Sequence, residues 1–168
     1  KFGFQNLYGS EGASSVTSNG IEYLDGVNDF VQMQTYQDSG ASKDLYISGG
    51  DASCYFNANL ITGQSTGGSG GGEVKEAIAF KAHLTSAQTI TSDTPAKVNF
   101  NATTIDTNSS LVDGKFKPSV AGWYQVNGTL KDGSTTSSIR TIASLVMNGN
   151  KNIQVGTLKS DQGFYDWN

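Results

Sequence analysis

The chain has few of the residues that build reactive centres: its 168 residues include one cysteine, Cys54, and one histidine, His83. A single cysteine excludes an internal disulfide framework and a zinc site made of several thiolates. The string Gly-x-Ser-x-Gly around Ser65 runs into glycines and serines, which cannot hold the strained turn of a nucleophile elbow. We therefore assign no catalytic residue, no metal ligand and no cofactor, and we expect a protein that is not an enzyme.

Positive charge and long apolar runs are also scarce. Eleven Lys and Arg residues stand against fifteen Asp and Glu, for a net charge of −4, and the basic residues form no cluster. Binding to nucleic acid requires a concentrated basic surface, so this class of function is excluded. No run of apolar residues approaches the ~18 needed to cross a bilayer, and we expect no membrane insertion.

Small polar residues are abundant instead. Gly, Ser, Thr and Asn together make up 70 of the 168 residues, a mixture that disfavours helices. The apolar residues, 36% of the chain, occur in short alternating runs that suit half-buried strands. The fold class predicted from this composition is all-β.

Alternation predicts strands at residues Phe30–Tyr36, Leu45–Ile47, Ser53–Ile61, Ala77–Leu84 and Ile139–Met147. In the third of these segments the single cysteine shares one face with apolar residues. We expect its thiol to be a small buried group and not a reactive one.

A run of glycines and serines, Gly67–Gly72, divides the chain. Such segments carry too little side-chain mass to pack, and they commonly link folded regions. We predict a β-rich N-terminal attachment or shaft segment at 1–63, a linker at 64–73 and a second folded part at 74–168. The first part is too small to bury a core by itself, so we expect it to be stabilised by association with identical copies.

Two aspartates flank a turn near the start, Asp25 and Asp29, with Gly26 between them. Calcium sites need six or more oxygen ligands, and no loop here supplies a dense series of them. We interpret this segment as a hairpin turn.

The second part carries four short motifs in order: Ala79–Ala82, Lys97–Phe100, Gly114–Val126 and Ser144–Gly149. The longest, Gly-Lys-Phe-Lys-Pro-Ser-Val-Ala-Gly-Trp-Tyr-Gln-Val, resembles the central signature of the trimeric jelly-roll heads typified by complement component one q and tumour necrosis factor. The resemblance covers Ala79 to about Asn150. It implies a jelly-roll β-sandwich, a homotrimer and binding instead of catalysis. The later strands of that family, a Gly-Asp-x-Val segment and a closing Phe-Ser-Gly-Phe strand, have no counterpart after residue 150. We expect the head to be truncated or continued beyond Asn168, and the alternative is that a neighbouring chain completes the sandwich.

Apolar residues on both faces of Ile139–Met147 predict a contact between copies. A strand at a sandwich surface is normally polar on its outer face. We assign Ile142 and Val146 to the trimer contact, together with Tyr124 from the central motif. The alternative is that a loop of the same chain covers them.

Aromatic residues near the end of the chain, Tyr165 and Trp167, are candidates for stacking on sugar rings. The whole chain looks like a bacteriophage fibre or spike protein, located at the virion surface or outside the cell. Its expected partners are two further copies, other virion proteins and a host-surface glycan or protein. The alternative is a secreted complement-like or lectin-like module.

Overall fold

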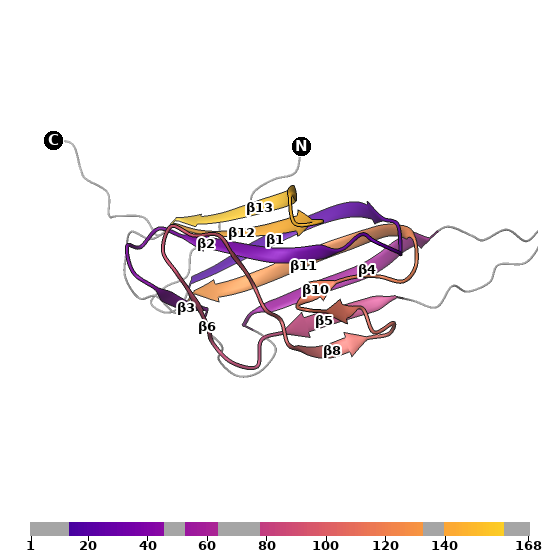
Figure 1. Ribbon diagram of the computed structural model, residues 1–168, viewed down its shortest axis with the longest axis horizontal. Coiled ribbons are helices and arrows are strands. Elements are labelled where there is room, and N and C mark those ends of the chain that lie inside the picture. The colour runs from indigo at the N-terminus through magenta and orange to yellow at the C-terminus, as the bar shows by residue number, and fades with distance from the viewer. Residues whose placement is uncertain (1–13, 46–52, 64–77, 133–139, 160–168) are drawn as a thin grey trace, which may run out of the picture.

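The computed structural model describes residues 14–45, 53–63, 78–132 and 140–159 (Figure 1). Within these residues all regular structure is β and there is no helix, so the predicted fold class is confirmed. Two antiparallel sheets carry the described strands. Because no helix is present in this part of the chain, it contains no helical candidate for a membrane span.

Sheet I has seven strands. They are β1 (Ser14–Leu24), β3 (Lys43–Leu45), β4 (Tyr55–Gly63), β5 (Ala79–His83), β6 (Gln88–Ile90), β8 (Ala102–Asp106) and β11 (Gly122–Asp132). The long strands follow the order β1-β11-β4-β5-β8, as Figure 1 shows, and the short β3 and β6 extend the sheet beside the end of β11.

Sheet II has six strands. They are β2 (Val31–Gln37), β7 (Ala96–Lys97), β9 (Leu111–Val112), β10 (Lys115–Phe116), β12 (Arg140–Met147) and β13 (Lys151–Lys159). Their order is β13-β12-β2-β10-β9, and β7 also pairs with β2. The buried side chains of both sheets form one hydrophobic cluster, as in a β-sandwich.

Alternation explains why the best-predicted strands form. In β5, Phe80 and Ala82 are buried while Lys81 and His83 are half-buried, and β11 alternates in the same way along most of its length. A strand places successive side chains on opposite faces, so this pattern puts one apolar row into the core. The strands predicted at 30–36, 53–61 and 77–84 correspond to β2, β4 and β5.

Five aromatic rings form a continuous row through the core. Neighbouring ring centroids lie 5.8 Å apart for Phe100 and Phe56, 5.5 Å for Phe56 and Phe80, 4.9 Å for Phe80 and Phe116, and 5.3 Å for Phe116 and Tyr124. Offset and edge contacts at such distances add stabilisation beyond the apolar area they bury. The central sequence motif thus supplies two core rings, Phe116 and Tyr124.

The predicted division into two folded parts differs from the observed pairing. β1 pairs with β11 from Ser14↔Asp132 to Leu24↔Gly122, and β4 pairs with both β11 and β5. Strands from either side of the Gly-rich segment therefore share both sheets. Residues 64–77 lie outside the described part, but the strands on either side of them are neighbours in one sandwich and not parts of separate domains. The first part completes its core with the second part, where we had expected only identical copies to do so.

Candidate functional site

The outer face of sheet I, formed by side chains that point away from the core, is the candidate functional surface. One end of it is apolar and aromatic. Ile21 and Tyr23 of β1, Ile61 of β4 and Trp123 of β11 are 53%, 40%, 50% and 50% exposed, respectively. We call these four residues the aromatic end.

Strand register brings the aromatic end together. Tyr23 is paired with Trp123 across the β1–β11 ladder, and their ring centroids lie 5.8 Å apart at an interplanar angle of 67°. The β4–β11 ladder shifts register beside Trp123, where a bulge places Ile61 on the exposed side. A bulge re-aims side chains in this way. The result is a cluster of large apolar groups contributed by three strands.

The middle of the same face is polar. Asn57 of β4 donates a hydrogen bond from Nδ2 to Oδ1 of Asn127 at 3.0 Å, and the hydroxyls of Thr17 and Thr129 lie 3.0 Å apart. The buried Oδ1 of Asn57 has no partner among the described residues. The centre of the face therefore consists of amide and hydroxyl groups, with Lys81 opposite Asn57.

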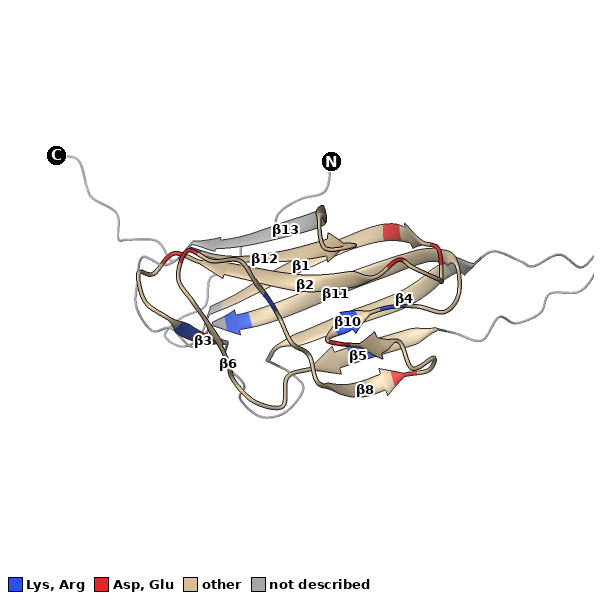
Figure 2. Cartoon of the chain, viewed as in Figure 1, with Lys and Arg blue, Asp and Glu red and all other residues tan. Residues whose placement is uncertain are grey.

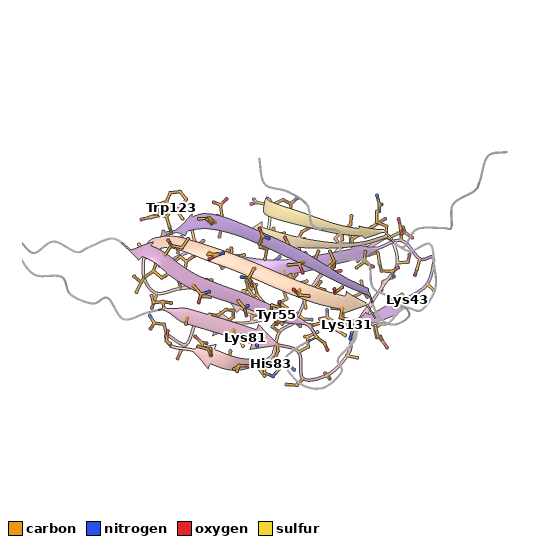
Figure 3. All side chains as sticks on the ribbon, turned by 180° about the vertical axis from the view of Figure 1, so that it is seen from behind. Lys43, Tyr55, Lys81, His83, Trp123 and Lys131 are labelled. Atoms are coloured by element: carbon orange, nitrogen blue, oxygen red, sulfur yellow. The ribbon has the colours of Figure 1, made fainter. Side chains whose placement is uncertain are left out.

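Basic side chains lie on the rest of the face, as Figure 3 shows. Lys81 and His83 of β5 lie opposite Asn57 and Tyr55 of β4, and Lys131 lies farther from Trp123. The Lys81 Nζ sits 5.7 Å from the centroid of the Tyr55 ring, a cation–π distance, and His83 Nδ1 lies 3.4 Å from the Thr104 hydroxyl. Elsewhere on the described strands Lys and Arg are scattered (Figure 2).

The residues predicted to contact other copies are not brought together. Tyr124 is 0% exposed, and its hydroxyl donates to the Val120 carbonyl at 2.7 Å; burial raises its pKa to about 12. Val146 is 2% exposed and lies apart from the main core, where the β12–β13 ladder shifts register. Packing within one chain therefore accounts for both residues, which corrects their assignment to a trimer contact.

Ile142 is half-buried on sheet II, in a groove that Tyr36 and Arg140 also line. It is therefore not part of the outer face of sheet I. Tyr165, Trp167 and Ser65 lie outside the described residues. The exposed residues that sequence reasoning missed, Ile21 and Tyr23, were signalled only by their alternation with Gly20 and Glu22.

The single cysteine behaves as predicted. Cys54 is 1% exposed, its Sγ accepts a hydrogen bond from the Lys131 backbone N–H at 3.3 Å, and burial raises the pKa of its thiol. A raised pKa keeps the sulfur protonated and poorly nucleophilic. Across the described ranges, no three His, Cys, Asp or Glu residues gather as a metal site would require.

The carboxylates of Asp25 and Asp29 accept hydrogen bonds within the first turn. Asp25 Oδ1 accepts hydrogen bonds from the backbone N–H groups of Val27, Asn28 and Asp29 at 2.8 to 2.9 Å. Asp29 Oδ2 accepts from the Asp25 N–H at 2.9 Å, and its Oδ1 accepts from Asn148 Nδ2 at 2.8 Å. These contacts fit the interpretation of the segment as a turn, with both carboxylates engaged by the protein's own donors.

Acid should weaken this turn. The backbone N–H groups, that of Asp29 first, lower the pKa of Asp25 below its usual 3.8. A lowered folded-state pKa gives a contribution that is present above pH 3.8 and is lost as the pH falls through the folded value. We expect Asp25→Asn, which keeps an acceptor oxygen but loses the charge, to melt below the wild type at pH 6, and the difference to shrink at pH 2.5. Thermal unfolding followed by circular dichroism at both pH values measures this, and an unchanged difference would contradict it.

Comparison with known proteins adds no relative: the sequence matches no protein-family model, no curated protein and no solved structure.

Proposed function

We propose that this chain is a non-catalytic structural module of a viral fibre or spike, of the bacteriophage type. In this proposal it assembles as a homotrimer at the virion surface and contacts a host-surface glycan or protein. The observation that carries the proposal is the aromatic end of sheet I. Four large apolar side chains, each at least 40% exposed, sit together on three neighbouring strands, while the exposed Ile105 stands apart from them on β8. Clusters of this kind mark surfaces that bind another macromolecule.

Identical copies are the partner that the surface favours. The aromatic end lies at one end of the outer face, and amide and basic side chains lie away from it, so copies around a symmetry axis can bring their aromatic ends together while the polar remainder stays hydrated. Burying a large apolar side chain is worth roughly 1.5–3 kcal/mol, and symmetry multiplies that gain by the number of copies. The motifs that resemble trimeric jelly-roll heads favour three copies.

Trp123→Asp should dissociate the assembly. The wild-type chain of 17.7 kDa is expected to scatter light as three copies, three times 17.7 or about 53 kDa, and the variant as one. Because each tenfold change in affinity corresponds to about 1.4 kcal/mol, losing one buried indole per copy should weaken association by at least about 100-fold. Multi-angle light scattering over a dilution series measures it. Far-ultraviolet circular dichroism should be unchanged, since the Trp123 side chain is already half exposed in the single chain.

Val112→Asp is the matched control, because Val112 is equally exposed at 48% but lies on β9 of sheet II. It should leave the mass at three copies. A wild-type mass of one chain at every concentration, or equal dissociation by both variants, would overturn the proposed interface.

The Tyr23–Trp123 pair also supports a second candidate, a lectin-like module that binds sugars through exposed aromatic rings. A labelled chain on a glycan array separates the two. If the wild type scatters as one copy and Trp123→Ala abolishes glycan binding, the chain is a lectin-like module. If the chain is a trimer whose aromatic end is covered, Trp123→Ala should not abolish glycan binding.

A further inference from the structure

The four described strands that precede the Gly-rich segment form no ladder with one another. β1 pairs only with β11, β3 with β11 and β6, and β4 with β11 and β5. β2 pairs with β12, β10 and β7. We call residues 14–63 the donor part and residues 78–159 the acceptor part. Among the described residues, every backbone ladder of the donor part runs to the acceptor part.

The donor part occupies interior positions in both sheets. β4 lies between β11 and β5, and β2 lies between β12 and β10. Without these two strands, each sheet would be divided and would expose the edges on both sides of the gap. Exposed edges present unpaired N–H and C=O groups, which are ready to pair with any matching strand.

The core is shared in the same way. Phe56 of the donor part contacts both Phe80 and Phe100 of the acceptor part. Gly128 of β11 lies so close to Met33 of β2 that a Cβ on the glycine would stand 2.6 Å from the Met33 sulfur. The donor and acceptor parts therefore pack their side chains closely against each other, in addition to pairing their backbones.

The covalent link between the parts is longer than their geometry needs. β4 and β5 are antiparallel neighbours, with Asn59 opposite Ala79 and the Leu60 N–H donating to the Ile78 carbonyl at 3.0 Å. Two residues can join such neighbours. The sequence instead places residues 64–77 here, with five glycines and two serines. In general, a Gly/Ser-rich chain of this length has a root-mean-square span of roughly 20 Å.

We propose that residues 14–63 are an exchangeable strand donor, which can complete the acceptor part of a second copy of this chain. The ladders and the aromatic contacts are the same whichever copy supplies the donor. Its own acceptor is favoured only by the effective concentration that the link provides, of the order of millimolar for a short flexible linker. Exchange should therefore dominate where copies are held side by side. The proposal does not depend on the outer face of sheet I.

Complementation between two full-length variants tests the exchange. Phe56→Asp disables the donor part and Phe80→Asp disables the acceptor part, so neither chain should show cooperative unfolding alone. Refolded together from urea, they can form one complete sandwich per pair of chains. We expect up to half of the wild-type unfolding amplitude by circular dichroism, in a particle that contains both chains.

The matched control is a mixture of Phe56→Asp chains and Ala58→Asp chains. The second substitution also disables the donor part, since Ala58 is 0% exposed on the same strand. This mixture should recover nothing. The exchange is refuted if the first mixture recovers nothing while the wild type refolds under the same conditions, or if the control recovers equally.

A second measurement avoids core variants. A protease site is inserted between Gly70 and Gly71 of the otherwise unchanged chain, which is prepared in an isotopically heavy and a light form. The two forms are unfolded, mixed, refolded and then cleaved. Native mass spectrometry should find hybrid donor–acceptor complexes whose fraction rises with the chain concentration during refolding, towards a limit of half where exchange dominates. Chains refolded and cleaved separately before mixing set the background, and hybrids at that background level would also refute the proposal.

Discussion

Phe56→Ala is expected to destabilise the sandwich by about 3–5 kcal/mol, the usual cost of removing a large buried aromatic side chain. Phe56 is 0% exposed and contacts Phe80 and Phe100, so its loss leaves a cavity in the middle of the aromatic row. Urea unfolding followed by tryptophan fluorescence and by circular dichroism measures the change. Because β4 is interior to sheet I, both probes should shift together in one transition.

Asn59→Ala is the control for this substitution. Asn59 is exposed on the same strand, so its replacement should change stability by less than about 0.5 kcal/mol. A wild-type protein that unfolds in two separated steps, with Phe56→Ala shifting only one of them, would contradict the single shared core.

Gly26→Ala should cost about 2–5 kcal/mol although it adds only a methyl group. Gly26 has a φ of +73°, where an L side chain costs roughly 1–2 kcal/mol. An added Cβ would also stand 2.5 Å from the Ala121 nitrogen and 2.6 Å from the Val120 carbonyl carbon. These are backbone atoms of the turn in the central motif, so they cannot rotate away, and overpacking adds about 1–3 kcal/mol. Chemical denaturation measures the loss.

Gly40→Ala separates the two causes. Gly40 has a similar φ of +75°, but nothing lies within 4 Å of where its Cβ would be. Both substitutions reduce the entropy of the unfolded chain equally, so the difference between them isolates the clash with the 120–121 peptide. Equal destabilisation by both variants would show that a Cβ at position 26 does not clash with the backbone of Val120 and Ala121.

The strands that could be predicted from the sequence were those with a local alternation of apolar and polar residues. β5 was predicted because Phe80 and Ala82 alternate with Lys81 and His83 within five residues. The burial of Cys54, directly before β4, followed from a similar alternation with Phe56 and Ala58. Such signals need no knowledge of the partner strand, because the period of two is a property of one strand.

β1 was not predicted, and its residues explain why. Its inward positions include Ser18, which is 1% exposed, while Ile21 and Tyr23 point outward. Val16 and Leu24 are buried near the two ends of the strand, but the inward positions between them are Ser18, Gly20 and Glu22, so no run of alternating apolar residues marks the strand in the sequence. The aromatic end was missed for the same reason, because it exists only once β1 is aligned with β11.

Tyr124 and Val146 were assigned to a contact between copies, although they are buried within one chain, because burial has two possible sources. Apolar groups on both sides of β12 indicate that both sides are covered, but they do not tell whether the cover belongs to the same chain. For Val146 the single chain is sufficient. The domain division failed on a related point, since a Gly-rich segment does not reveal whether the strands beside it pair with each other.

The interleaved topology has a consequence for biosynthesis. Ser18 pairs with Gly128 and Gln34 with Ser144, so the earliest described strands wait for partners made about 110 residues later. At a synthesis rate of roughly 5–20 residues per second, that delay is on the order of 5–20 seconds. During this interval the nascent chain carries unpaired strand edges and exposed aromatic side chains, so it is prone to aggregate until the partner strands are made.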